Sequence, residues 1–227
     1  MKKVLYIILV SGFSLILIAC AEKEESTTTD TAAITSSDDS SDDSSDDSSI
    51  TSGSTTTATG SISVGSESLT GSYSSSCLTT DRAGTTLSSS VSGGNLPSNT
   101  IAMKYYLIVT SSSSLEFSDY YYSDASCLTS NVSAAEIWTY FSVGSASGSN
   151  YLITYTRYST SYISYDTTAK TFLDTALETT TTIGTAHTVL NDSPIKDIIY
   201  VSSNSVKIGQ SSSSDHPSSV YDTEMTK

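Results

Sequence analysis

Apolar and polar residues divide the chain into three parts. An apolar run occupies positions 4–18, a segment made almost entirely of Ser, Thr and Asp continues to about position 60, and short runs rich in Tyr, Thr, Val and Ile recur to position 227. These short runs lack the long 3.6-residue period of surface helices and are typical of strands. The pattern predicts a targeting segment, a linker and one β-rich domain over residues 61–227.

Eight runs in the last part are predicted to be strands, because they are rich in β-branched and aromatic residues and are bounded by Ser, Gly, Asn or Asp. They are 69–78, 100–110, 115–122, 135–143, 150–158, 161–165, 197–202 and 205–208. Short strands at hairpin-like spacing favour an all-β fold. We predict an antiparallel barrel, since closure hides the strand edges. The alternative is an immunoglobulin-like β-sandwich, which a disulfide between two facing sheets would favour.

The N-terminal apolar run has the organisation of an export signal. Lys2 and Lys3 precede it, and it is shorter than the roughly 20 apolar residues that a membrane span needs. It ends in Leu-Ile-Ala-Cys at 17–20, which resembles the lipobox of bacterial lipoproteins. The resemblance implies a signal peptide at 1–19, cleavage before Cys20 and lipid on the Cys20 sulfur. Two or more acyl chains anchor a protein stably to a membrane.

The residues after Cys20 bear on the location of the anchored chain. Ala21 stands where an Asp would resemble an inner-membrane retention signal, and the Glu-Lys-Glu-Glu sequence at 22–25 is similar to a surface-export signal of some Gram-negative lipoproteins. We therefore expect a lipid anchor in the bacterial outer membrane, with the protein either in the periplasm or exposed at the surface.

Residues 20–60 are expected to form a lipidated Cys followed by a disordered acidic tether. Positions 21–60 carry ten acidic residues and one Lys, with few apolar side chains. Such a segment cannot bury enough apolar surface to offset chain entropy, and its like charges extend it. Its paired Asp residues lack the ligand alternation and Gly of a calcium loop, so we predict no metal site. The acidity also argues against nucleic acid as a partner.

Cys77 and Cys127 are the two cysteines of the predicted domain. An isolated pair in an exported protein most simply forms a disulfide. A metal-binding pair or a reactive thiol is the alternative, but the chain has no further cysteine beside Cys20 and neither of its two histidines is close in sequence.

Several short motifs resemble small lipocalin-like bacterial lipoproteins. Gly71-Ser72-Tyr73, followed by Cys77, is similar to the first strand of that group, and 121–127 is similar to the later strand that ends in the partner cysteine. The segments at 197–202 and 206–209 resemble the closing hairpin of the same group. The resemblance implies an eight-stranded calycin-type barrel with a disulfide from an early strand to a middle one. Tyr73 replaces the Trp that is usual in lipocalins, and no catalytic residue is transferred.

Motifs for catalysis are not found. His187 and His216 do not form a metal-binding pair, and the Gly-rich segment at 144–148 has Ala146 where a hydrolase elbow has its nucleophilic Ser. The central strands carry four acids that are candidates for a carboxylate pair, and we expect them to form the solvated face of a sheet: Glu116, Asp119, Asp124 and Glu136. We predict no enzyme and no cofactor, with a hydrolase that uses His187 as the last alternative.

Tyrosines gather in the middle strands and give the strongest indication of function. Successive strand residues point to opposite faces, so Tyr151, Tyr155 and Arg157 share one face of the strand at 150–158. An interior face would bind a small apolar or amphipathic molecule, with Tyr106 as a further contact. Outward Tyr rows would contact a surface glycan or another partner, and the simplest alternative is core packing. We predict a membrane-tethered binding domain, with a structural or surface-adhesion lipoprotein as the alternative.

Overall fold

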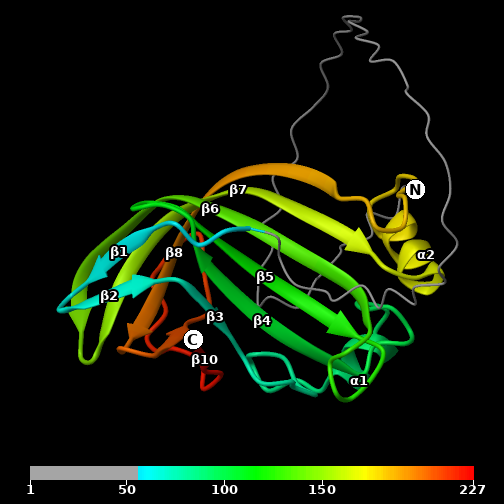
Figure 1. Ribbon diagram of the computed structural model, residues 1–227, viewed down its shortest axis with the longest axis horizontal. Helices are drawn as coiled ribbons and strands as arrows, with labels where there is room; N and C mark the ends of the chain where they lie inside the picture. The colour runs from blue at the N-terminus through cyan, green and yellow to red at the C-terminus, as the bar shows by residue number, and fades with distance from the viewer. Residues whose placement is uncertain (1–55) are drawn as a thin grey trace, which may run out of the picture.

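A computed structural model of the chain describes residues 56–227 (Figure 1). The predicted signal peptide, Cys20 and most of the predicted tether lie outside the described residues. Eight strands form a closed barrel in the order β3-β4-β5-β6-β7-β8-β9-β10, and β10 pairs with both β9 and β3. Every pairing is between antiparallel strands that follow one another around the ring, which makes an up-and-down barrel. The predicted antiparallel barrel is confirmed, and the alternative of a sandwich is wrong.

The elements have the following bounds. They are β1 (Ser61–Val64), β2 (Glu67–Thr70), β3 (Ser72–Ser74), α1 (Leu87–Ser92), β4 (Ala102–Val109), β5 (Leu115–Tyr122), β6 (Ser130–Ser147), β7 (Asn150–Ser164), α2 (Thr167–Ala176), β8 (His187–Val201), β9 (Ser205–Ile208) and β10 (Met225–Thr226). Strand β7 is continuous where the sequence predicted two strands, because Ser159 and Thr160 are buried and pair with β8. Neither helix was predicted.

Helix α2 forms in a Thr-rich segment of low helix propensity. Its N-cap is Asp166, whose carboxylate accepts a hydrogen bond from the backbone N–H of Ala169 at 2.7 Å. Ala169 and Leu173 are buried and join the main core. Capping and burial of one face therefore outweigh the low propensity of the threonines.

A column of aromatic rings fills the middle of the barrel. Trp138 stacks on Tyr155, with ring centroids 3.9 Å apart, and on Phe117 at 5.2 Å. Tyr105 continues the column beyond Phe117, and Phe141 lies beyond Tyr155. These side chains come from four neighbouring strands, so the column runs across the inner face of β4, β5, β6 and β7. Such stacked pairs add about 0.5–1.5 kcal/mol each beyond the area they bury.

The β1–β2 hairpin covers one end of the barrel. It packs against both β4 and β8, which lie opposite one another in the ring. Ile62, Val64 and Leu69 of the hairpin are buried in the main core. Its turn uses Gly65 at φ +63°, and a Cβ there would lie 1.9 Å from the hydroxyl of Tyr151. The close approach of the turn to the barrel therefore requires glycine.

Residues just before the hairpin also contact the barrel. The N–H groups of Thr59 and Gly60 both donate to the carbonyl of Val109, and the Thr56 hydroxyl donates to the carboxylate of Glu116. The sequence predicted that the domain begins at position 61. Within the described residues, contacts with the barrel begin a few residues earlier, at Thr56.

The predicted disulfide is present. Cys77 and Cys127 are joined by an S–S bond of 2.03 Å, which links the segment after β3 to the loop between β5 and β6. That loop is also ordered by Asp124, whose carboxylate accepts hydrogen bonds from three backbone N–H groups, those of Ser126, Leu128 and Thr129.

Candidate ligand-binding site

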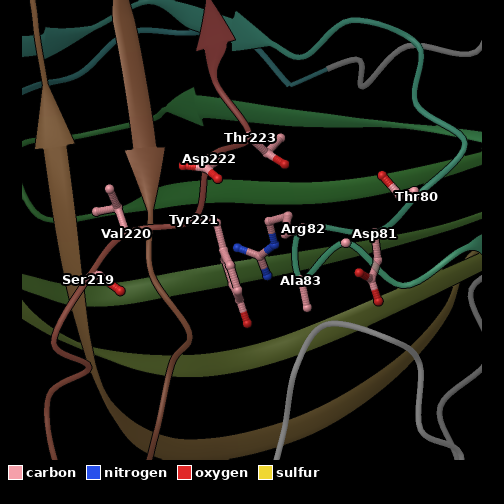
Figure 2. A pocket seen from close by; sticks show the side chains of 10 residues that line it. Thr80, Asp81, Arg82, Ala83, Ser219, Val220, Tyr221, Asp222 and Thr223 are labelled. Atoms are coloured by element: carbon pink, nitrogen blue, oxygen red, sulfur yellow. The ribbon is translucent and has the colours of Figure 1, made fainter.

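Two loops line a pocket of about 510 Å³ at the barrel (Figure 2). One loop supplies Thr80 to Gly84, between β3 and α1, and the other supplies Ser219 to Thr223, just before β10. The first loop is held in a tight turn, in which the Asp81 carboxylate accepts a hydrogen bond from the backbone N–H of Thr85 at 2.8 Å. The lining is mostly polar, with Asp81 and Asp222 beside a single cation, Arg82.

Arg82 is held among aromatic rings. Its guanidinium carbon lies 4.7 Å from the centroid of Phe117, 5.3 Å from that of Tyr105 and 5.6 Å from that of Tyr221. Figure 2 shows its side chain alongside that of Tyr221. Contacts of this kind contribute about 0.5–2 kcal/mol each. The backbone N–H of Arg82 donates to the Tyr105 hydroxyl at 3.1 Å, which fixes the loop to the column of rings.

The guanidinium has no hydrogen bond or ion pair with any residue in the part of the chain that the structure describes. Burial lowers the pKa of the guanidinium. Its electrostatic interactions with Tyr105, Asp119 and Asp197 raise the pKa by more than burial lowers it, so the net pKa lies above the ordinary value of arginine. Arg82 is therefore a permanent cation, and contacts with aromatic rings hold its guanidinium in place where a paired carboxylate ordinarily would.

Two buried carboxyl groups lie within electrostatic range of Arg82. Burial raises the pKa of Asp119 to about 7, and the charge of Arg82 opposes the rise. Burial likewise raises the pKa of Asp197 to about 7, against hydrogen bonds from backbone N–H groups and the charge of Arg82. Both carboxyls are thus poised to gain or lose a proton near neutral pH.

Polar atoms of β5 point into the barrel without partners. The side chains of Asp119 and Tyr121 face inward, and within residues 56–227 neither the Asp119 Oδ1 atom nor the Tyr121 hydroxyl has a hydrogen-bond partner. A buried polar atom left unpaired costs about 1–3 kcal/mol. These two atoms therefore mark an interior region with capacity to bind polar groups.

A second cation lies farther along the interior. Arg157 pairs with Glu136, with its Nε atom 3.3 Å from a carboxylate oxygen, and the other oxygen of Glu136 accepts a hydrogen bond from the Trp138 indole at 2.9 Å. Arg82 and Arg157 are the two arginines of the sequence, and both lie against the aromatic column. The scarcity of arginine in the sequence is therefore the signal that could have pointed to both residues.

The four predicted ligand contacts are divided between two faces. Tyr155 and Arg157 are together inside the barrel, and Tyr151 is half-buried against the hairpin turn. Tyr106 lies on the outer face, where it packs against Tyr120, with centroids 5.2 Å apart, and belongs to the cluster around the disulfide. The structure therefore brings Tyr155 and Arg157 together and places Tyr106 elsewhere.

The candidate acids also differ from expectation. Asp119, Glu136 and Glu116 are buried, so the predicted solvated face is wrong for these three, while Asp124 orders the loop after β5. Inside the barrel, Glu136 pairs with Arg157 and Asp119 lies within electrostatic range of Arg82. Outside it, Glu116 accepts hydrogen bonds from the hydroxyl groups of Thr56 and Ser118. Among the described residues no three acidic, Cys or His side chains form a group that would hold a metal ion.

Comparison with known proteins leaves the site to be interpreted from its own chemistry. No protein-family model matches the chain, and a search of curated proteins finds no significant match. Between residues 56 and 227, no helix combines the length and apolar character needed to span a bilayer.

Proposed function

We propose that this protein is a lipid-anchored, non-enzymatic binding protein whose barrel binds a small amphipathic molecule at the Arg82 pocket. The observation that carries the proposal is the Arg82 guanidinium, which faces a pocket, is flanked by three aromatic rings and has no carboxylate partner among the described residues. A guanidinium binds a carboxylate through two parallel hydrogen bonds. The ring of Tyr221, which lines the pocket, offers apolar surface for the rest of the ligand.

Protonation of the buried acids affects the ligand that this pocket accepts. With pKa values of about 7, Asp119 and Asp197 are mostly neutral at pH 6 and mostly charged at pH 8. Neutral carboxyls do not repel an anionic head group beside Arg82. The site is therefore best suited to an amphipathic acid under mildly acidic conditions.

The anchoring part of the proposal rests on the lipobox-like sequence that ends at Cys20. Acylation of this cysteine in the outer membrane would hold the barrel near the bilayer, a source of amphipathic ligands. The closed eight-stranded barrel is consistent with the resemblance to lipocalin-like lipoproteins. An intact mass of the mature chain without added lipid would contradict this step.

A structural role is the second candidate, and the aromatic column favours it. Trp138, Tyr155 and Phe117 fill the centre of the barrel, which limits the depth to which a ligand enters. In that case the barrel is a rigid domain held at the membrane, and it contacts its partners through its outer surface.

Replacement of Arg82 tests the ligand site directly. We expect the full chain to bind dansyl-labelled undecanoic acid at pH 6, measured by dansyl fluorescence, and the R82Q variant to bind it at least about tenfold more weakly, because charged hydrogen bonds contribute about 1.5–3 kcal/mol. K104Q is the matched control, since Lys104 lies beside Tyr106 on the outer face and its loss removes the same charge. Equal affinity in R82Q and the parent, or no binding by a folded parent, would reject the Arg82 site.

The raised pKa of Asp119 predicts a pH-dependent stability. Because the folded pKa of about 7 exceeds the unfolded value of about 4, the protonated group stabilises the fold below pH 4, and this contribution is lost as the pH rises through 7. D119N removes the ionisable group, so we expect it to be more stable than the parent at pH 8 by on the order of 2 kcal/mol, with little difference at pH 4. Urea unfolding at both pH values measures this. D215N, at an exposed carboxyl, is the control.

A further inference from the structure

Two exposed tyrosines lie side by side on the outside of the barrel. Tyr140 of β6 and Tyr158 of β7 are 78% and 50% exposed, although each is followed in its strand by a buried residue, Phe141 and Ser159. Together with Ser113, Ser114 and Thr139 they line a second pocket of about 290 Å³. This pocket is separate from the Arg82 pocket and shares no residue with it.

Irregular pairing between β6 and β7 places these tyrosines outward. The register shifts beside both of them, between Ile137 and Trp138 and again between Thr139 and Ser142. The second shift turns Phe141 inward, where it stacks on Tyr155, and leaves Tyr140 directed outward. Bulges of this kind redirect side chains and are frequent next to functional sites.

The backbone at Tyr140 is strained. Its φ is +53°, a left-handed conformation that is rare for a bulky aromatic residue. The N–H of the next residue, Phe141, donates to the carbonyl of Ser113 at 2.9 Å, so the turn between β4 and β5 holds this conformation in place. The ring of Tyr140 gains no burial in return for this strain, which suggests that its exposure is the useful property.

The chemistry of the lining identifies the ligand class. All five lining residues carry a hydroxyl group, and none of them is charged. A tyrosine presents a flat apolar face and a polar edge. A pyranose ring has the matching form, with C–H groups on one face and hydroxyl groups around its rim. The net charge of −14 disfavours acidic sugars, since no cation lines the pocket to offset it.

We infer that the pocket between Tyr140 and Tyr158 binds a neutral carbohydrate, with the two rings stacking on sugar faces and the hydroxyl groups of Ser113, Ser114 and Thr139 binding the rim. This site gives the protein a second, outward-facing function that does not depend on ligand binding at Arg82.

The test uses the full chain and three defined sugars: maltohexaose, chitohexaose and the acidic oligomer hexagalacturonate, titrated by calorimetry. We expect one of the neutral sugars to bind, and the acidic sugar to bind at least about tenfold more weakly. The double variant Y140A/Y158A should lose at least about tenfold in affinity, whereas Y140F/Y158F should retain most of it because the rings remain. L128A, at another exposed apolar residue, is the control and should not change the affinity.

A separate variant distinguishes a loss of ring contact from a loss of fold. Glycine tolerates a positive φ, so Y140G should raise the midpoint of thermal unfolding and still weaken sugar binding. Failure of both neutral sugars to bind the parent, or unchanged affinity in Y140A/Y158A, would overturn the inference. Binding of phosphatidylcholine vesicles that is lost in Y140A/Y158A would overturn it in favour of a membrane contact. Sugar binding that persists in R82Q would keep the two sites independent.

Discussion

Replacement of Trp138 by alanine is expected to lower the free energy of unfolding by about 3–5 kcal/mol, the range typical of a buried aromatic residue. Trp138 is 2% exposed and lies between the rings of Phe117 and Tyr155 in the middle of the column. Its loss would leave a cavity where the barrel wall has no other side chain to fill it. The same change removes the indole hydrogen bond to Glu136 and leaves a buried carboxylate with one partner fewer.

Urea-induced unfolding followed by far-UV circular dichroism measures this effect, since the variant lacks the single tryptophan needed for fluorescence. W138F keeps an aromatic ring in the column but loses the indole hydrogen bond and part of the buried volume, so it should fall between the parent and W138A. The exposed Tyr158 provides a control, and Y158A should change stability by less than about 1 kcal/mol. A loss in W138A no greater than in Y158A would mean that the column does not support the barrel.

Removal of the disulfide is expected to cost about 4 kcal/mol, because the bond between Cys77 and Cys127 closes a loop with a sequence separation of 50. For a domain of this size, such a loss lowers the thermal midpoint by on the order of 10 °C. The folded structure should survive, since the loop after β5 keeps its hydrogen bonds to Asp124.

The measurement compares thermal unfolding of the parent with that of C77S/C127S, both with and without dithiothreitol. Reductant should lower the midpoint of the parent to that of the variant and leave the variant unchanged. A midpoint of the parent that does not respond to reductant, with loss of the bond shown by mass, would contradict the entropic stabilisation.

The fold was predictable because its signals are local. The run 115–122 alternates, so that Leu115, Phe117 and Tyr121 share an inward face, and β5 occupies the predicted range. The disulfide was likewise predictable from composition, since Cys77 and Cys127 are the two cysteines of residues 61–227. Continuity of β7 was missed because Ser159 and Thr160 resemble a linker in sequence, whereas bulged pairing to β8 keeps them in the strand.

The candidate site was predictable only in part. Tyr155 and Arg157 were found because strand alternation places them on one face, which the structure shows to be the inner one. Arg82 was missed because it lies in a loop, and its partners Phe117 and Tyr221 are brought to it only by closure of the barrel. The burial of Asp119 was not predicted for a related reason. A carboxyl group on a strand is usually exposed to solvent, and the cation near Asp119, Arg82, is distant in sequence.

The ring closes through very few residues. Met225 and Thr226 of β10 supply the pairing between β9 and β3, and Thr226 has its partner in Ser74, near the other end of the described chain. Contacts between such distant positions form late, because the loop entropy must be overcome first. Until they form, β3 and β9 each present an open edge to which another chain can add a strand. The species most prone to self-association is therefore the nearly complete barrel, in which residues 225–226 have not yet paired with β3 and β9.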